Sequence, residues 1–190
     1  MAFLTLFEWI IFAIWVFFWS YWFIVAYLTR SPVKRRQSAM VPMLPLIAIA
    51  VWFVISVLFP GLLFMQIVPG GTVTGLVGIV ITLAGLGFAV WARIHLGSNW
   101  SGQPVIRIDH TLVQSGPYRI VRNPIYTGIL IAGIGSTIVI GKFWALAVTI
   151  IILVVFIAKI RSEESFLLEE FGESFIDYKQ KVKSLIPYIF

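Results

Sequence analysis

Long uncharged stretches alternate with short polar ones along this chain of 190 residues. Residues 9–28 carry no charge, and a helix of that length rising 1.5 Å per residue crosses a hydrocarbon core of roughly 30 Å. No charged residue occurs between Arg36 and Arg93, a distance too long for one span, and Pro69-Gly70-Gly71 predicts a turn near its middle. Two spans are therefore expected there, at about 43–66 and 72–94.

Two shorter uncharged runs, residues 123–141 and 143–158, predict a tight helical hairpin that turns at Gly141-Lys142. Lys142 is expected to reach the surface by extending its flexible stem. The first span follows no basic segment and no small-residue cleavage motif, so it is interpreted as an anchor rather than a removable signal. The pattern predicts an all-α integral membrane protein with five transmembrane helices.

The composition supports this class and excludes others. Hydrophobic residues make up 60% of the chain and charged residues 12%, about half the charged share of a soluble domain. A β-barrel is excluded because its strands alternate in hydrophobicity. The chain has no cysteine and two histidines, so disulfides and thiolate catalysis are absent and no metal site is expected.

The basic residues predict the orientation. Apart from Lys142, all of them follow the first, third or fifth span, at 30–36, 93–122 and 159–183. Alternation of the spans brings these groups to one side, and the positive-inside rule makes that side cytoplasmic. The N-terminus is therefore expected outside and the C-terminus inside. The net charge of +6 is then explained by the orientation of the chain in the membrane, so no nucleic-acid partner is expected.

Two cytoplasmic stretches hold most of the remaining polarity. The loop 95–123 is rich in Gly, Ser, Asn, Gln, Pro and His. The tail 162–190 has apolar residues at spacings of three and four, which predicts a C-terminal amphipathic cytoplasmic helix that Gly172 divides. The chain is interpreted as a single membrane domain, 1–190, with three spans in 1–92 and a loop, hairpin and tail in 93–190.

Paired glycines do not indicate a Rossmann domain. Gly85-x-Gly87 and Gly133-x-Gly135 lack a third glycine and lie inside apolar spans. Together with Gly128, Ala132 and Ser136, they favour close helix packing through small residues.

Candidate chemistry is concentrated at the inner membrane face. Because the last two spans form a hairpin, polar residues before the fourth span and after the fifth should meet. The first group comprises Gln103, His110, Tyr118, Arg122, Asn123 and Tyr126, and the second Lys159, Arg161, Glu163 and Glu164.

These residues carry a resemblance to a known family. The matching segments are Arg93 to Ser101, His110 to Val113, Ser115 to Tyr118, Arg122 to Gly128, Glu163-Glu164, Phe171-Gly172, Tyr178 and Pro187. This ordered pattern, from about Trp91 to Pro187, resembles the isoprenylcysteine carboxyl methyltransferases and the wider membrane phospholipid methyltransferases.

The resemblance implies that S-adenosylmethionine binds in a cytoplasmic pocket formed by the loop, the ends of the last two spans and the tail. It implies Lys159 and Arg122 as catalytic residues. The implied cofactor-binding residues are Gln103, His110, Thr111, Leu112, Val113, Tyr118, Asn123, Pro124, Ile125, Tyr126 and Glu163. Two positions depart from the family pattern: Asn123 replaces a histidine, and Lys159 replaces an arginine and so lacks its bidentate fork.

The implied activity is methyl transfer to a lipidic or prenylated substrate, with carboxyl methylation of isoprenylcysteine type as the leading reaction. An ionised carboxylate needs no general base, so the protein must mainly align it and exclude water. An amine acceptor would need a proton acceptor such as His110 or Glu163. The alternatives are phospholipid N-methylation, a membrane NADPH-dependent sterol-type reductase, and a non-catalytic membrane partner.

Overall fold

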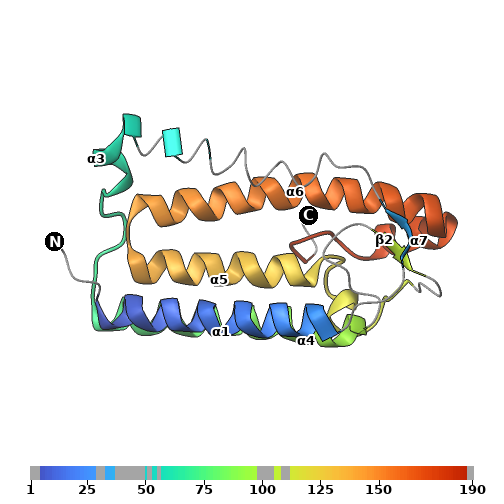
Figure 1. Ribbon diagram of the computed structural model, residues 1–190, viewed down its shortest axis with the longest axis horizontal. Coiled ribbons are helices and arrows are strands. Elements are labelled where there is room, and N and C mark those ends of the chain that lie inside the picture. The colour runs from blue at the N-terminus through green and yellow to red at the C-terminus, as the bar shows by residue number, and fades with distance from the viewer. Residues whose placement is uncertain are drawn as a thin grey trace.

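The four long helices of the described part of the chain lie side by side along the long axis of the molecule (Figure 1). The computed structural model describes residues 5–28, 33–36, 50, 53–54, 57–97, 105–107 and 112–187. The long helices are α1 (Leu6–Leu28), α4 (Thr72–Leu96), α5 (Pro124–Ile140) and α6 (Phe143–Phe171). The strands β1 (Val33–Arg36) and β2 (Val105–Arg107), the 3-10 turn η2 (Gly116–Arg119) and helix α7 (Glu173–Lys181) gather at one end, and α3 (Pro60–Leu63) lies at the other.

The helical membrane class is confirmed. Helices α1, α4 and α6 are long and apolar enough to cross a membrane, whereas α5 has 17 residues. Of the predicted span 43–66 the structure describes residues 50, 53–54 and 57–66, which include the short helix α3. The count of five spans therefore stays a prediction. The antiparallel pair β1–β2, which places Val33 opposite Arg107, was not predicted and adds a small ribbon to the all-α expectation.

The last long helix differs from its prediction. Helix α6 continues unbroken for 29 residues, past the expected end of the fifth span at residue 158. Gly172, with φ of +51°, then separates α6 from α7, as the position of the glycine predicted. The charged residues at 159–170 therefore extend the spanning helix instead of forming a separate one.

Small residues bring α4 and α5 into close contact. A Cβ atom on Gly85 would lie 2.5 Å from both the Gly128 carbonyl oxygen and the Ala132 amide nitrogen. A Cβ atom on Gly135 would lie 2.6 Å from the Gly78 carbonyl oxygen of α4. The predicted packing role is confirmed for these glycines. Gly87 is the exception, because its Cβ position faces open space.

We expect Gly85→Ala to destabilise the protein by about 1–3 kcal/mol, because the added methyl group meets backbone atoms that cannot rotate away. Thermal unfolding in detergent measures the effect. Gly87→Ala is the matched control two residues away and should unfold within about 0.5 kcal/mol of wild type. Equal stability of the two variants would contradict the close approach.

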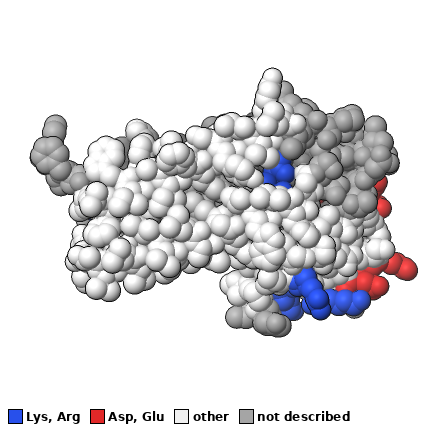
Figure 2. All heavy atoms as spheres, turned by 90° about the horizontal axis from the view of Figure 1, so that it is seen from below, with Lys and Arg blue, Asp and Glu red and all other residues white. Residues whose placement is uncertain are grey.

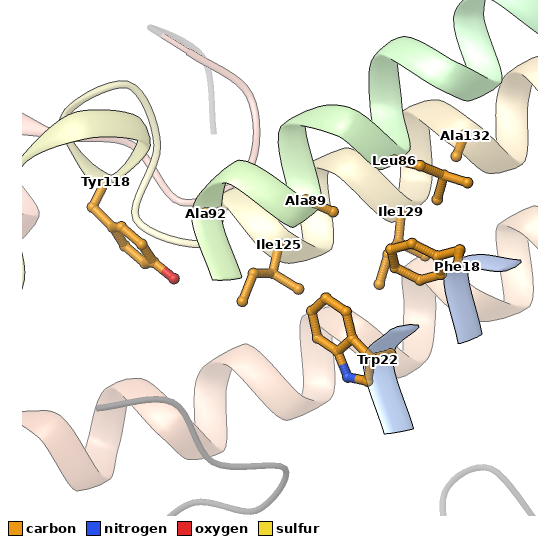
Figure 3. Packing of buried hydrophobic residues seen from close by; sticks show 9 residues of the cluster. All are labelled: Phe18, Trp22, Leu86, Ala89, Ala92, Tyr118, Ile125, Ile129 and Ala132. Carbon is orange, nitrogen blue, oxygen red and sulfur yellow. The ribbon is translucent and has the colours of Figure 1, made fainter. Parts of the chain in front are cut away.

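A hydrophobic cluster joins α1 to the α4–α5 pair (Figure 3). Phe18 and Trp22 of α1 contact a surface built from Leu86, Ala89 and Ala92 of α4 and Ile125, Ile129 and Ala132 of α5, with Tyr118 of η2 at its end. Farther along the bundle, the Trp15 indole donates a hydrogen bond to Ser136 Oγ at 3.0 Å. The bundle therefore holds the start of α5 in a fixed place.

Candidate active site

The charges divide between the two ends of the bundle. In Figure 2 most of the visible acidic and basic side chains gather at one end, which carries α7 and which we call the polar end. At the opposite end Lys142 Nζ lies 3.9 Å from a Glu8 carboxylate oxygen. This separation agrees with the charge pattern that predicted the topology.

Helix α5 begins at the polar end, where Pro124 follows Asn123. Proline is favoured in the first helical turn because its missing N–H has no partner to lose there. The backbone N–H groups of Arg122 and Asn123 donate to the carbonyls of Lys183 and Ser184, at 2.8 and 3.0 Å. The chain after α7 therefore lies against the start of α5.

Tyr126, Lys159 and Glu163 form the centre of the candidate site. The Tyr126 hydroxyl donates to the Glu163 carboxylate, 2.8 Å from Oε1 and 2.9 Å from Oε2. Lys159 Nζ lies 3.7 Å from Glu163 Oε1 and 5.4 Å from the centre of the Tyr126 ring. The predicted meeting of the two polar groups is therefore found between α5 and α6.

Arg122 is directed away from this centre. Its Nε and Nη2 donate to Glu164 Oε1 at 3.0 and 2.6 Å, and its Nη1 donates to the carbonyls of Val182 and Lys179. Lys179 Nζ lies 2.9 Å from the other Glu164 oxygen. We call Arg122, Glu164 and Lys179 the ion-pair network. Its geometry favours a positioning role for Arg122, whose catalytic role stays a prediction.

Asn123 is also engaged with the chain end. Its Nδ2 donates to the hydroxyl and the carbonyl of Ser184 at 3.0 and 3.3 Å. The neighbouring Thr127 hydroxyl donates to the Leu185 carbonyl at 2.8 Å. The Asn123 carbonyl accepts hydrogen bonds from the backbone N–H and the hydroxyl of Thr127, at 3.0 and 3.2 Å. The side chain of Asn123 therefore holds the chain that follows α7, and Oδ1 is the group that a ligand can meet.

The turn before α5 is held by α4 and α7. His95 Nε2 lies 2.8 Å from Ser115 Oγ, and a Cβ on Gly116 would lie within 2.7–2.9 Å of the His95 ring. Gly116 has φ of +58°, a conformation that glycine adopts without strain. The Tyr178 hydroxyl donates to the Tyr118 carbonyl at 2.5 Å. These contacts fix the position of Tyr118.

The other predicted site residues divide into three sets. Gln103, His110 and Thr111 lie outside the described residues. Leu112 and Val113 are partly buried, and Val113 packs against the hydrophobic cluster. Pro124 and Ile125 are buried, so their side chains support the start of α5. His95 and Ser184 were not among the predicted site residues, because neither lies in a repeated pattern that indicates a contact.

Comparison with known proteins shows the family. Residues 73–174 match the family model described as phospholipid methyltransferase. The chain belongs to this family. The matched range contains all of α4 but its first residue, the whole loop 95–123, α5, α6 and the Tyr126–Lys159–Glu163 centre. It confirms the resemblance found in the sequence.

Several proteins of similar sequence share the name protein-S-isoprenylcysteine O-methyltransferase. The chain is 33% identical over 118 residues to a probable protein-S-isoprenylcysteine O-methyltransferase of Oryza sativa, covering 60% of this chain and 61% of the relative. It is 30% identical over 154 residues to the enzyme of that name from Tribolium castaneum, covering 78% and 53%. The Schizosaccharomyces pombe enzyme is 38% identical over 82 residues, covering 43% and 35%.

A solved structure is also similar. It is that of the eukaryotic intramembrane Ras methyltransferase, isoprenylcysteine carboxyl methyltransferase, with a TM-score of 0.53 and 25% identity. The match covers 82% of this chain and 55% of that one. This chain thus spans between about a third and three fifths of the length of the relatives that it matches.

The residues at the centre suit S-adenosylmethionine, the methyl donor that the family implies. This cofactor offers hydroxyl and ammonium donors and a positively charged sulfonium. Glu163 supplies a carboxylate acceptor, and the Tyr126 ring already attracts a cation, Lys159. Phe156, whose ring centre lies 4.6 Å from that of Tyr126, adds a second aromatic face. Among the described residues no group of side chains suits a metal ion.

Alkaline pH tests the packing of α7 on the turn. Burial raises the pKa of the Tyr178 hydroxyl above its ordinary value of about 10, while Arg122 lowers it less strongly. The stabilisation is present below pH 10 and is lost as pH rises above it, because the unfolded phenol ionises first. Wild type should lose more thermal stability between about pH 9 and 11 than Tyr178→Phe. Parallel pH profiles would contradict this burial.

Proposed function

We propose that this chain transfers a methyl group from S-adenosylmethionine to a lipid-attached or hydrophobic acceptor at the polar end of the bundle. Carboxyl methylation of isoprenylcysteine type is the leading reaction, because the relatives carry that name. The observation that carries the proposal is the Tyr126–Lys159–Glu163 centre, a polar cluster at the end of an apolar bundle and inside the matched range.

Glu163 and Tyr126 are proposed to hold the cofactor, which supplies an electrophilic methyl group when bound. The Glu163 carboxylate accepts hydrogen bonds from the cofactor's hydroxyl or ammonium donors. Tyr126 orients Glu163 through its hydroxyl and offers its ring to the positive charge. The other proposed contacts are the segment 110–113, Gln103, Tyr118 and the backbone of residues 123–125.

Lys159 is proposed to hold the acceptor carboxylate. Its ammonium group lies 3.7 Å from Glu163 Oε1, and its side chain is 21% exposed. An ammonium group carries a positive charge and three donors that suit a carboxylate. An aligned carboxylate attacks without losing a proton, so these residues act by orientation, charge and exclusion of water.

Phospholipid N-methylation is the second candidate. The family model carries that description, and Glu163 lies where a carboxylate could take a proton from an amine acceptor. In either case we propose that the chain is a single membrane domain whose polar end is cytoplasmic and whose substrate enters from the membrane.

Ligand binding by the full chain in lipid nanodiscs tests the proposal. S-adenosylhomocysteine should bind and NADPH should not. Labelled S-adenosylmethionine should then methylate N-acetyl-S-farnesylcysteine but not its carboxamide, which lacks the free carboxylate. Absence of S-adenosylhomocysteine binding would overturn the proposal, and transfer to phosphatidylethanolamine alone would replace the leading reaction by the second candidate.

A further inference from the structure

Two adjacent glutamates of α6 join it to α5 through different partners. Glu163 accepts the Tyr126 hydroxyl, whereas Glu164 accepts two nitrogens of Arg122. Tyr126 lies in the first turn of α5, and Arg122 lies two residues before this helix begins at Pro124. Helix α6 therefore makes two neighbouring contacts at the polar end, one with α5 and one with the residues just before it. Only the first belongs to the proposed cofactor site.

Glu164 is fully engaged. Oε1 faces the Arg122 guanidinium and Oε2 faces Lys179 Nζ of α7 at 2.9 Å. The side chains of Arg122 and Glu164 are 8% and 13% exposed, so little of either is left for a ligand. Glu164 thus connects α6 to α7 through Lys179, and to the residues just before α5 through Arg122.

The C-terminal segment, residues 178–185, completes this connection. Arg122 donates to the carbonyls of Lys179 and Val182, and the N–H groups of Arg122 and Asn123 donate to Lys183 and Ser184. The Tyr178 hydroxyl reaches the Tyr118 carbonyl. One guanidinium therefore links α6, the C-terminal segment and the start of α5.

We propose that Glu164 is a positioning residue that acts through Glu163. By anchoring α6 to Arg122 and Lys179, it fixes the rotation of α6 at which Glu163 meets Tyr126 and faces the cofactor. Glu164 itself touches neither cofactor nor acceptor. This inference rests on the proposed function, because its effect is measured through S-adenosylhomocysteine binding.

A double-mutant cycle on the full chain tests the inference. Glu164→Gln should weaken S-adenosylhomocysteine binding about tenfold, the effect expected when one charge-assisted hydrogen bond is removed. In a Glu163→Gln background the same change should weaken binding less than about twofold, because residues that act as one unit are not additive. Glu173→Gln, an exposed glutamate of α7, is the matched control and should bind as wild type does. Affinities are compared below the unfolding temperature of every variant.

Each outcome supports or overturns the positioning role of Glu164. Unchanged affinity in Glu164→Gln overturns the inference while wild-type binding leaves the proposed function standing. Full additivity in the cycle overturns it too, because Glu164 would then contact the ligand independently. If Glu164→Gln fails to fold, Lys179→Met, at a half-exposed position, replaces it: about a threefold loss supports the inference and no loss overturns it. A wild type that binds no S-adenosylhomocysteine overturns both.

Discussion

Glu163→Gln is expected to weaken S-adenosylhomocysteine binding by roughly ten- to a hundredfold. The change removes a charged hydrogen-bond acceptor at a partly buried site, and a bond of that kind contributes about 1.5–3 kcal/mol. Glutamine has the same shape and keeps one oxygen that the Tyr126 hydroxyl can reach, so the fold should remain. Titration of the ligand into the purified variant measures the effect.

Two controls separate the cofactor role of Glu163 from a structural one. Tyr126→Phe removes the hydroxyl that orients Glu163 but keeps the carboxylate and the aromatic ring, so binding should weaken by less than in Glu163→Gln. Glu173→Gln removes a charge from the surface and should leave affinity unchanged. An affinity for Glu163→Gln equal to wild type would reject the proposed cofactor contact, whereas aggregation of this variant alone would point to a structural ion pair with Lys159.

Arg122→Met is expected to cost about 3–5 kcal/mol of stability. It removes one partner of a largely buried pair and leaves the Glu164 carboxylate with Lys179 alone. It also removes the bonds from the guanidinium to the carbonyls of Lys179 and Val182. Thermal unfolding in detergent should show the loss, and the chain after α7 should become accessible to protease.

The neighbouring arginine supplies the control for this variant. Arg119 lies three residues earlier in η2 and is exposed, so Arg119→Met should change stability by less than about 0.5 kcal/mol. The double variant Arg122→Met/Glu164→Met should be more stable than Arg122→Met, because replacing both partners leaves no buried charge unpaired. A loss of less than about 1 kcal/mol in Arg122→Met would show that the network contributes only as a surface pair does.

Local sequence patterns predicted the helices and their close packing, because uncharged runs, turn residues and small residues indicate these features directly. The uncharged run 123–141 predicted α5, Gly141-Lys142 predicted the hairpin turn, and Gly172 predicted the break that ends α6. Glycines spaced along apolar runs predicted the close approach of α4 and α5, although Gly87 shows that such spacing does not give the direction in which each glycine faces.

The different partners of Glu163 and Glu164, Tyr126 and Arg122, could not be predicted. Adjacent helical residues point about 100° apart, and the sequence does not give the absolute rotation of α6 against α5. The contacts of Asn123 with Ser184 depend on where an irregular chain end lies in space. Such backbone contacts have no period and no characteristic residue type, so only the three-dimensional arrangement reveals them.

The unbroken length of α6 gives the site a defined depth. With 29 residues, the helix is about 43 Å long at 1.5 Å per residue, which exceeds a hydrocarbon core of roughly 30 Å. Measured from Phe143, Lys159 lies about 24 Å and Glu163 about 30 Å along the axis. With Phe143 at one boundary of the hydrocarbon core, both residues would lie near the opposite boundary, between acyl chains and headgroups. If the proposed function holds, we expect an acceptor anchored in the bilayer to react only when its nucleophile reaches that level. The length of α6 would then select acceptors by the distance between the lipid anchor and the reactive group.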